Sequence, residues 1–144
     1  MKILLFPISL LYSFVIRIKN YIYDNSLIKQ YCSEKYVISI GNIVVGGTGK
    51  TPMTIYICRE IVKRGISVGI ISRGYKRKSK GCVIVSDGKK ILTNTLSAGD
   101  EPYMIASKVN TVPVIVDSNR KRAIKIMNKI FNRDIIILDD AFQH

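Results

Sequence analysis

A glycine-rich turn between an apolar segment and a helix-like segment most constrains the fold of this chain. The turn occupies residues 46–51, with the sequence GGTGKT, and it follows an apolar run at residues 36–40. A strand, a glycine-rich turn and Gly-Lys-Thr at a helix start form the order in which a P-loop holds nucleotide phosphates. In that motif Lys50 reaches the β- and γ-phosphates and the Thr51 hydroxyl holds Mg²⁺. We therefore expect the nucleotide to contact Val45, Gly46, Gly47, Thr48, Gly49, Lys50 and Thr51.

One position departs from the usual P-loop pattern. The pattern G-x-x-x-x-G-K-[ST] has glycine five residues before Gly49, and this sequence has Val44 there. The alternative interpretation is a glycine-rich turn that binds nothing. The strand-to-helix boundary is the context that the motif requires, and it favours the nucleotide-binding interpretation.

Composition narrows the class of protein. A chain of 144 residues with 47% hydrophobic residues can form one domain with a sizeable core, which excludes a disordered chain. The formal net charge of +13 favours an anionic partner, which could be a nucleotide, a nucleic acid or an acidic membrane surface.

The cysteines, Cys32, Cys58 and Cys82, form no C-x-x-C pair, so neither a zinc site nor a disulfide framework is indicated. A reducing cytosol is the simplest inference.

The first 24 residues form a segment distinct from the domain at residues 25–144. Residues 3–16 are free of charge but shorter than the roughly 20 residues that span a bilayer, and no signal-peptide cleavage site follows. A helix in the membrane interface fits better, with Arg17 and Lys19 near anionic head groups and Tyr21 and Tyr23 at the boundary. Packing against the domain core and a full span with snorkelling flanks are the alternatives.

Beyond this segment the pattern alternates between strand and helix. We expect strands at residues 36–40, 66–72, 112–116 and 135–138, and helices at residues 51–64, 102–109 and 119–131. Residues 82–86 and 90–93 flank Asp87-Gly88 and predict a hairpin. Near-continuous apolar strands separated by helices indicate an α/β fold, a P-loop NTPase-like parallel sheet covered by helices on both faces.

Ligands bind such a sheet at the carboxyl ends of its strands, so the residues that follow each strand matter. Asp139 and Asp140 end the last apolar strand, as in the Walker-B arrangement that holds Mg²⁺; they could instead cap the next element. Arg73 follows the second strand and would lie beside the phosphates if that strand neighbours the first. The alternative is that Arg73 and the basic residues after it lie in a solvated loop. These basic residues are Lys76, Arg77, Lys78 and Lys80, and they could equally meet phosphates of a substrate or a membrane.

Asp100 lies in a turn ahead of a predicted helix. An aspartate there commonly caps the helix, and its position alone favours that role. It could also accept a proton from a substrate hydroxyl, which a kinase requires.

Five ordered blocks of this sequence together resemble the tetraacyldisaccharide 4′-kinase family of lipid A biosynthesis. They are residues 39–43 (SIGNI) running into 45–52 (VGGTGKTP), 72–75 (SRGY), 99–102 (GDEP) and 139–144 (DDAFQH). The apolar N-terminus with its basic end also resembles the membrane-associating helix of that family. Because the family also lacks the first P-loop glycine, Val44 is no objection to the resemblance.

The resemblance implies transfer of a phosphoryl group from ATP to the 4′-hydroxyl of an acylated glucosamine disaccharide 1-phosphate. The reaction would take place at the cytoplasmic face of the bacterial inner membrane. The residues implied are Lys50 and Thr51 for the phosphates and Mg²⁺, Asp139 and Asp140 for the metal, Arg73 and Arg120 near the transferring phosphate, and Asp100 for proton abstraction. The last role reverses the preference for capping. Gln143 and His144 complete the terminal signature, with less defined roles.

The chain departs from the family at its end. Family members continue beyond the position of His144 into a second half that helps to close the site. We therefore expect the 144-residue chain alone to bind nucleotide weakly and to turn over little or not at all.

Three rival interpretations remain at this point. One is a membrane-associated P-loop ATPase or GTPase, although no Asn-Lys-x-Asp segment specifies guanine. Another is a basic nucleic-acid-binding module. Stacking on bases is poorly supported for it, because Tyr75 is the one aromatic residue in the basic run. The third is a degraded remnant of the kinase.

Overall fold

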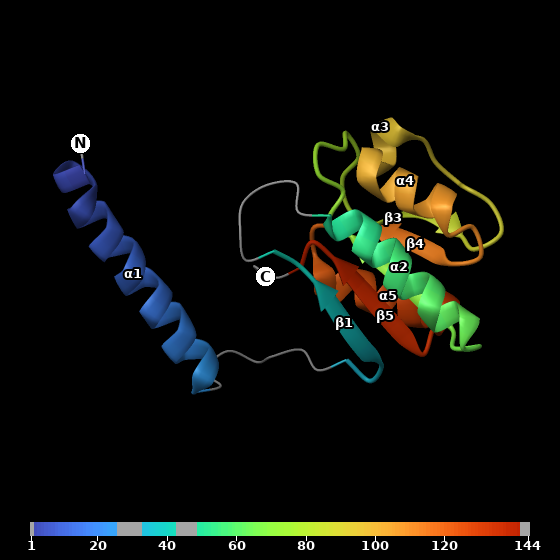
Figure 1. Ribbon diagram of the computed structural model, residues 1–144, viewed down its shortest axis with the longest axis horizontal. Helices are drawn as coiled ribbons and strands as arrows, with labels where there is room; N and C mark the ends of the chain where they lie inside the picture. The colour runs from blue at the N-terminus through green and yellow to red at the C-terminus, as the bar shows by residue number, and fades with distance from the viewer. Residues whose placement is uncertain (1, 26–32, 43–48, 142–144) are drawn as a thin grey trace. The chain divides into compact units, whose positions relative to one another are not determined.

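The computed structural model describes residues 2–25, 33–42 and 49–141, and the chain forms two compact units (Figure 1). Residues 1–32 make up the first unit and residues 33–144 the second. The loop residues Val45, Gly46, Gly47 and Thr48, and the terminal Gln143 and His144, lie outside the described residues.

The first unit contains one long helix, α1 (Lys2–Asp24). The Ser13 hydroxyl donates to the Ser9 carbonyl at 2.9 Å, and the Asn25 amide group donates to the Tyr21 carbonyl at 2.8 Å where the helix ends. Several large apolar side chains of α1 are exposed: Leu10, Leu11, Tyr12, Phe14, Val15, Ile18 and Tyr21. Among the described residues, no helix has both the length and the apolar character needed to cross a bilayer.

The second unit is built on a five-stranded sheet of order β1-β5-β2-β4-β3. Its strands are β1 (Tyr36–Ile40), β2 (Val68–Ser72), β3 (Val83–Asp87), β4 (Pro113–Val116) and β5 (Ile135–Asp139). The predicted parallel arrangement is confirmed for β1, β5, β2 and β4. It is wrong for β3, which pairs antiparallel with β4. The segment between β2 and β3 contains no helix to carry the chain back across the sheet, so β3 begins at the edge where β2 ends and runs in the opposite direction.

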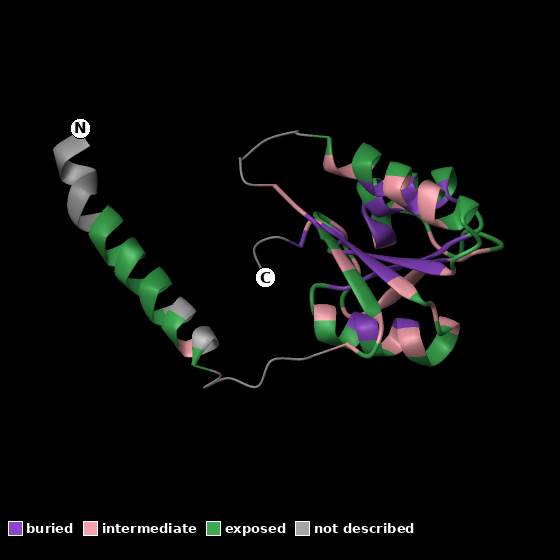
Figure 2. Cartoon of the chain, turned by 60° about the horizontal axis from the view of Figure 1, so that its bottom comes forward, coloured by how far each residue is buried: buried purple, intermediate pink, exposed green. Residues whose placement is uncertain are grey.

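Helices cover both faces of this sheet (Figure 2). On one face α2 (Lys50–Lys63), α3 (Thr95–Ala98) and α4 (Asp100–Lys108) pack over Val68, Ile70, Val114 and Val116. On the other face α5 (Arg120–Phe131) buries Met127 against Ile71, Ile115 and Ile136. The strands β2 and β4 are buried throughout, whereas β1 is an edge strand with Tyr36 81% exposed. The predicted α/β sheet with helices on both faces is therefore confirmed.

Two details differ from the sequence prediction. Residues 90–93 do not form a strand, because their pairing with β3 is limited to an isolated bridge between Ser86 and Ile91. The Asp87-Gly88 turn itself does form, with the Asp87 carboxylate accepting from the N–H groups of Lys89 and Lys90, each at 2.8 Å. The short helix α3 was not predicted; the Asn94 side chain caps it by accepting from Ser97 N–H at 3.0 Å.

The close packing of β2 against α5 predicts the effect of one substitution. A Cβ atom at Gly69 would lie 2.5 Å from Sδ and 2.8 Å from Cε of Met127, which is fully buried. We expect Gly69→Ala to lower the free energy of unfolding by about 1–3 kcal/mol in urea titrations, the usual cost of overpacking. In a Met127→Ala background the same change should cost much less, because the clashing atoms are gone. Equal costs in both backgrounds would contradict this packing account.

Candidate functional site

The carboxyl ends of four parallel strands meet at one edge of the sheet, and five of the predicted site residues that the structure describes lie there. The helix α2 begins at this edge with Lys50, and Asp139 and Asp140 stand at the end of β5. Arg73 follows β2, and α5 begins at Arg120 after β4. Ligands of such sheets bind at this edge. The topology therefore assembles residues that are up to 90 positions apart in the sequence.

Lys50 is the first residue of α2 and faces the acidic end of β5. Gly49 precedes it with φ of 79°, a left-handed conformation that glycine adopts without strain. The Lys50 ammonium nitrogen lies 3.0 Å from the Asp140 carboxylate. The lysine predicted to reach the phosphates and a carboxylate predicted to hold the metal thus share one site. Thr51, the next residue of α2, is half-buried.

Asp139 is the buried acidic group of the site, with 1% of its surface exposed. The Thr54 hydroxyl of α2 donates to one carboxylate oxygen at 2.9 Å, and the Ser72 hydroxyl of β2 donates to the other at 3.2 Å. Burial raises the pKa of the Asp139 carboxyl, although these two hydrogen bonds oppose the rise. The carboxylate is therefore held in one orientation by hydroxyl groups from two elements.

Sequence reasoning missed Thr54 and Ser72 as partners of the acidic site. Thr54 lies three residues after Thr51, so both lie on the same face of α2. Ser72 is the polar residue at the end of an otherwise apolar strand, next to Arg73. Both positions carried a usable signal, because a polar residue at a buried position needs a partner.

Asp140 is the more accessible acid, with φ of 55° and its side chain 43% exposed. The carboxylates of Asp139 and Asp140 accept from Thr54, Ser72 and Lys50, and in the described region neither caps a helix.

Within residues 2–25, 33–42 and 49–141, no three His, Cys, Asp or Glu side chains gather to form a closed metal cage. Mg²⁺ keeps several waters and phosphate oxygens as ligands, so it needs few ligands from the protein, and Thr51, Asp139 and Asp140 are the residues that could supply them.

Arg120 lies against the same strand end. Its Nη2 donates to the backbone carbonyls of Asp139 at 2.8 Å and Asp140 at 3.0 Å. Burial lowers the pKa of Arg120, and the charge of Arg73 adds to this effect while the two aspartates oppose it. The buried Nε and Nη1 atoms have no hydrogen-bond partner among the described residues. Two buried, unpaired donors on a half-buried cation are suited to an anionic oxygen.

Arg73 is exposed and follows β2 directly. Arg73 was expected beside the phosphates on the condition that β2 neighbours β1. This condition is wrong, because β5 lies between the two strands. The order instead places β2 next to the acidic strand. Arg73 therefore follows the neighbour of β5, and its charge acts on Arg120.

Asp100 is the first residue of α4, and Gly99 occupies the N-cap position. The capping role that position alone favoured for Asp100 is therefore wrong. Its exposed carboxylate lies in the first turn, where negative charge is favourable beside the helix dipole. Gly99 packs against the loop after Arg73, since a Cβ atom there would lie 3.1 Å from the Tyr75 carbonyl oxygen. This contact brings the start of α4 to the loop that carries Arg73.

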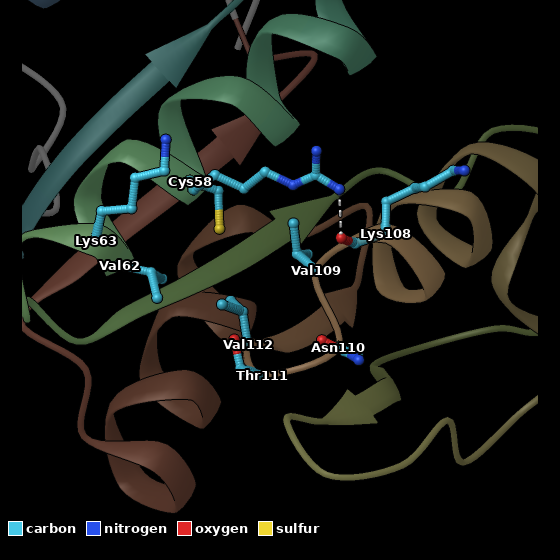
Figure 3. Close-up of a pocket in the computed structure, with 9 residues that line it drawn as sticks. Cys58, Val62, Lys63, Lys108, Val109, Asn110, Thr111 and Val112 are labelled. Atoms are coloured by element: carbon cyan, nitrogen blue, oxygen red, sulfur yellow. Dashed lines mark hydrogen bonds between the residues drawn. The ribbon is translucent and has the colours of Figure 1, made fainter.

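A separate pocket of about 220 Å³ opens near the amino ends of β2 and β4 (Figure 3). Val62 and Lys63 from the end of α2 face Val109, Thr111 and others from the segment before β4, and the Arg59 guanidinium donates to the Lys108 carbonyl at 2.9 Å. Burial raises the pKa of the Cys58 thiol to about 11, so this thiol stays protonated at neutral pH. The pocket contains none of the predicted site residues.

The sequence and the fold were compared with known proteins. The family model described as tetraacyldisaccharide-1-P 4′-kinase matches residues 1–144. A tetraacyldisaccharide 4′-kinase from Halothermothrix orenii is 45% identical over 99% of this chain and 38% of its own length. One from Desulfotalea psychrophila is 45% identical over 96% of this chain and 40% of its own length.

A solved structure gives the same result. LpxK from Aquifex aeolicus, crystallised in complex with ATP, matches with a TM-score of 0.87 and 38% identity, over 97% of this chain and 44% of that one. The chain thus spans about two fifths of the length of these relatives, 38% of the first. A family match over every residue, together with the same fold at this identity, leads to one conclusion: the chain belongs to the tetraacyldisaccharide-1-P 4′-kinase family.

Proposed function

We propose that this chain carries the ATP-binding part of a kinase that phosphorylates the 4′-hydroxyl of a tetraacyldisaccharide 1-phosphate lipid in lipid A biosynthesis. The observation that carries the proposal is the convergence of Lys50, Asp139, Asp140 and Arg120 at one edge of the sheet. Relatives that match almost the whole chain are tetraacyldisaccharide 4′-kinases, which supports the same activity.

The acidic residues and Thr51 would hold Mg²⁺ together with ATP. When bound, Mg²⁺ would neutralise negative charge on the phosphates. In the absence of ATP, the Lys50 ammonium group forms an ion pair with the Asp140 carboxylate at 3.0 Å. With Mg²⁺ and ATP bound, Asp140 would be a ligand of the metal and Lys50 would contact a phosphate. Asp139 keeps its orientation through Thr54 and Ser72.

The cations and Asp100 would carry the transfer itself. Charge developing on the transferred phosphoryl group is stabilised by fixed cations that need no rearrangement. Arg120 meets this requirement, because two backbone carbonyls hold it and two of its donor atoms are unpaired in the described region. Arg73 adds a second positive charge nearby. Asp100, exposed at the start of α4, would accept the proton of the attacking 4′-hydroxyl.

The helix α1 would hold the protein at the cytoplasmic face of the bacterial inner membrane, where an acylated substrate resides. Its exposed apolar side chains, among them Leu11 and Phe14, support this proposal, and so does the exposed Arg17. An amphipathic segment of this kind binds through its buried apolar area and its attraction to anionic lipids.

The phosphate-binding role of Lys50 predicts the result of one nucleotide titration. Lys50→Ala should weaken binding of Mg²⁺–ATP at least about tenfold, because a charge-assisted contact to phosphate is lost. Lys63→Ala is the matched control: it removes a lysine from the other end of α2 that is also ion-paired, with Glu60 at 2.7 Å. Isothermal titration calorimetry should find the control within about twofold of wild type, as for most exposed pairs. Equal affinities for all three proteins, or no preference for ATP over AMP, would overturn the assignment.

The role of Asp139 predicts a change in metal dependence. Asp139→Asn keeps the shape of the side chain and removes its charge, so the thermal shift that ATP produces with Mg²⁺ should fall to the value seen with ATP and EDTA. Asp134→Asn is the control, since Asp134 also accepts from a serine hydroxyl but is exposed and precedes β5 at the opposite edge of the sheet. The control should keep the Mg²⁺-dependent shift. A full Mg²⁺-dependent shift in Asp139→Asn would rule out a metal role for this carboxylate.

The membrane proposal predicts a difference between two double variants. Leu11→Asp/Phe14→Asp should lower binding to phosphatidylglycerol vesicles by about tenfold or more, since each buried CH₂ contributes about 0.8 kcal/mol. Tyr56→Asp/Ile130→Asp makes the same change at two exposed apolar positions of the second unit and should have a smaller effect. Vesicle sedimentation measures both. If the two double variants bind equally well, α1 is not the membrane contact.

A further inference from the structure

The loop between β2 and β3 forms a basic pocket that shares Arg73 with the proposed phosphoryl-transfer site and is otherwise lined by residues to which that proposal gives no role. The pocket has a volume of about 340 Å³ and lies between this loop and Ser118, which follows β4. Its lining carries four cationic side chains and no acidic one: Arg73, Lys76, Arg77 and Lys80. Such a lining attracts an anion.

The positive charge of the pocket is not neutralised by the protein. In the part of the chain that the structure describes, none of the four cations forms an ion pair. The neighbouring acid, Asp117, is fully buried and already paired with Arg122, whose Nε and Nη2 donate to it at 2.6 and 2.8 Å. Its Oδ1 also accepts from Asn119 N–H at 2.9 Å. The carboxylate of Asp117 therefore forms its ion pair with Arg122 of α5 and not with a cation of the pocket, which leaves the pocket with excess positive charge.

The loop is held in shape before any ligand arrives. The Arg77 guanidinium donates to the Val116 carbonyl at 3.4 Å, and Lys78 N–H donates to the Leu96 carbonyl at 2.8 Å. Gly74 has φ of 71°, and a Cβ atom there would lie 3.0 Å from the Ala98 carbonyl oxygen. These contacts tie the loop to β4 and α3. A pocket shaped in advance loses little entropy when it binds a ligand.

The pocket adjoins the edge where phosphoryl transfer is proposed. Arg73 lines it, and the preceding Ser72 donates to Asp139. An acceptor that already carries a phosphate would bring a second anion to this edge, in addition to ATP, and would need its own cations. We propose that this basic pocket binds the phosphate monoester already present on the sugar acceptor. The inference rests on the proposed kinase function and identifies where the anionic end of the acceptor lies.

The test uses glucosamine 1-phosphate as the probe and follows backbone amide shifts by NMR. Titrations are run with and without Mg²⁺ and a non-hydrolysable ATP analogue. The probe should shift the amides of residues 76–81 and Ser118 in both conditions. Lys76→Gln/Lys80→Gln should weaken this binding about tenfold, as expected for lost charge-assisted contacts. Lys78→Gln/Lys89→Gln removes the same charge from exposed lysines that do not line the pocket, and should stay within about twofold.

Three results would overturn the inference. One is an equal loss in both double variants, which would mean attraction to overall charge. Another is a set of shifts confined to residues 49–51 and abolished by the ATP analogue, which would place the probe in the nucleotide site. The third is protection of the loop by phosphatidylglycerol vesicles with no response to the sugar phosphate, which would assign the pocket to membrane lipid.

The ATP analogue separates this inference from the kinase proposal. Both double variants should bind the analogue as wild type does, because neither changes a residue placed in the ATP site. If the wild-type chain bound the sugar phosphate in the pocket but no ATP analogue, the kinase proposal would fail and the pocket would remain a phosphate site.

Discussion

The arrangement of the site depends on the burial of one carboxylate at the end of β5. Asp139 is 1% exposed, and hydroxyl groups from α2 and β2 hold its two oxygens. A buried carboxylate without partners would be strongly unfavourable, so these contacts link the helix that begins with Lys50 to the central strand. The same strand end supplies the carbonyls that hold Arg120. Lys50, Asp140 and Arg120 are therefore positioned by their relation to β5.

Charge is distributed unevenly around this strand end. The acids Asp139 and Asp140 stand in the middle, and cations from α2, α5 and the loop after β2 surround them. Arg120 keeps two buried donor atoms without partners among the described residues, which a phosphate oxygen would satisfy. The net charge of +13 agrees with the proposal that this site receives several phosphates. The basic pocket extends this cationic region along the same edge.

Much of the fold followed from hydrophobic patterning, because each buried strand is a short apolar run with a polar boundary. The expected strand at residues 36–40 matches β1, and the Asp139-Asp140 pair ends β5 as expected. Patterning carries no information on strand order or direction, so the position of β5 between β1 and β2 and the antiparallel β3 were not predicted. The roles of Thr54 and Ser72 also depend on contacts between residues 67 and 85 positions away from their partner. Position alone favoured Asp100 as the cap of α4, but Gly99, one residue earlier, takes that position.

The central claim is that Mg²⁺ and ATP bind where Lys50, Asp139 and Asp140 meet. Paramagnetic broadening of backbone amides by Mn²⁺–ATP tests it most directly, because Mn²⁺ takes the same oxygen ligands as Mg²⁺. We predict the strongest broadening at Thr51, Asp139 and Asp140, with little at the opposite edge near Lys63 and Lys108. Broadening centred on that opposite edge, or spread evenly over the basic surface, would contradict the account.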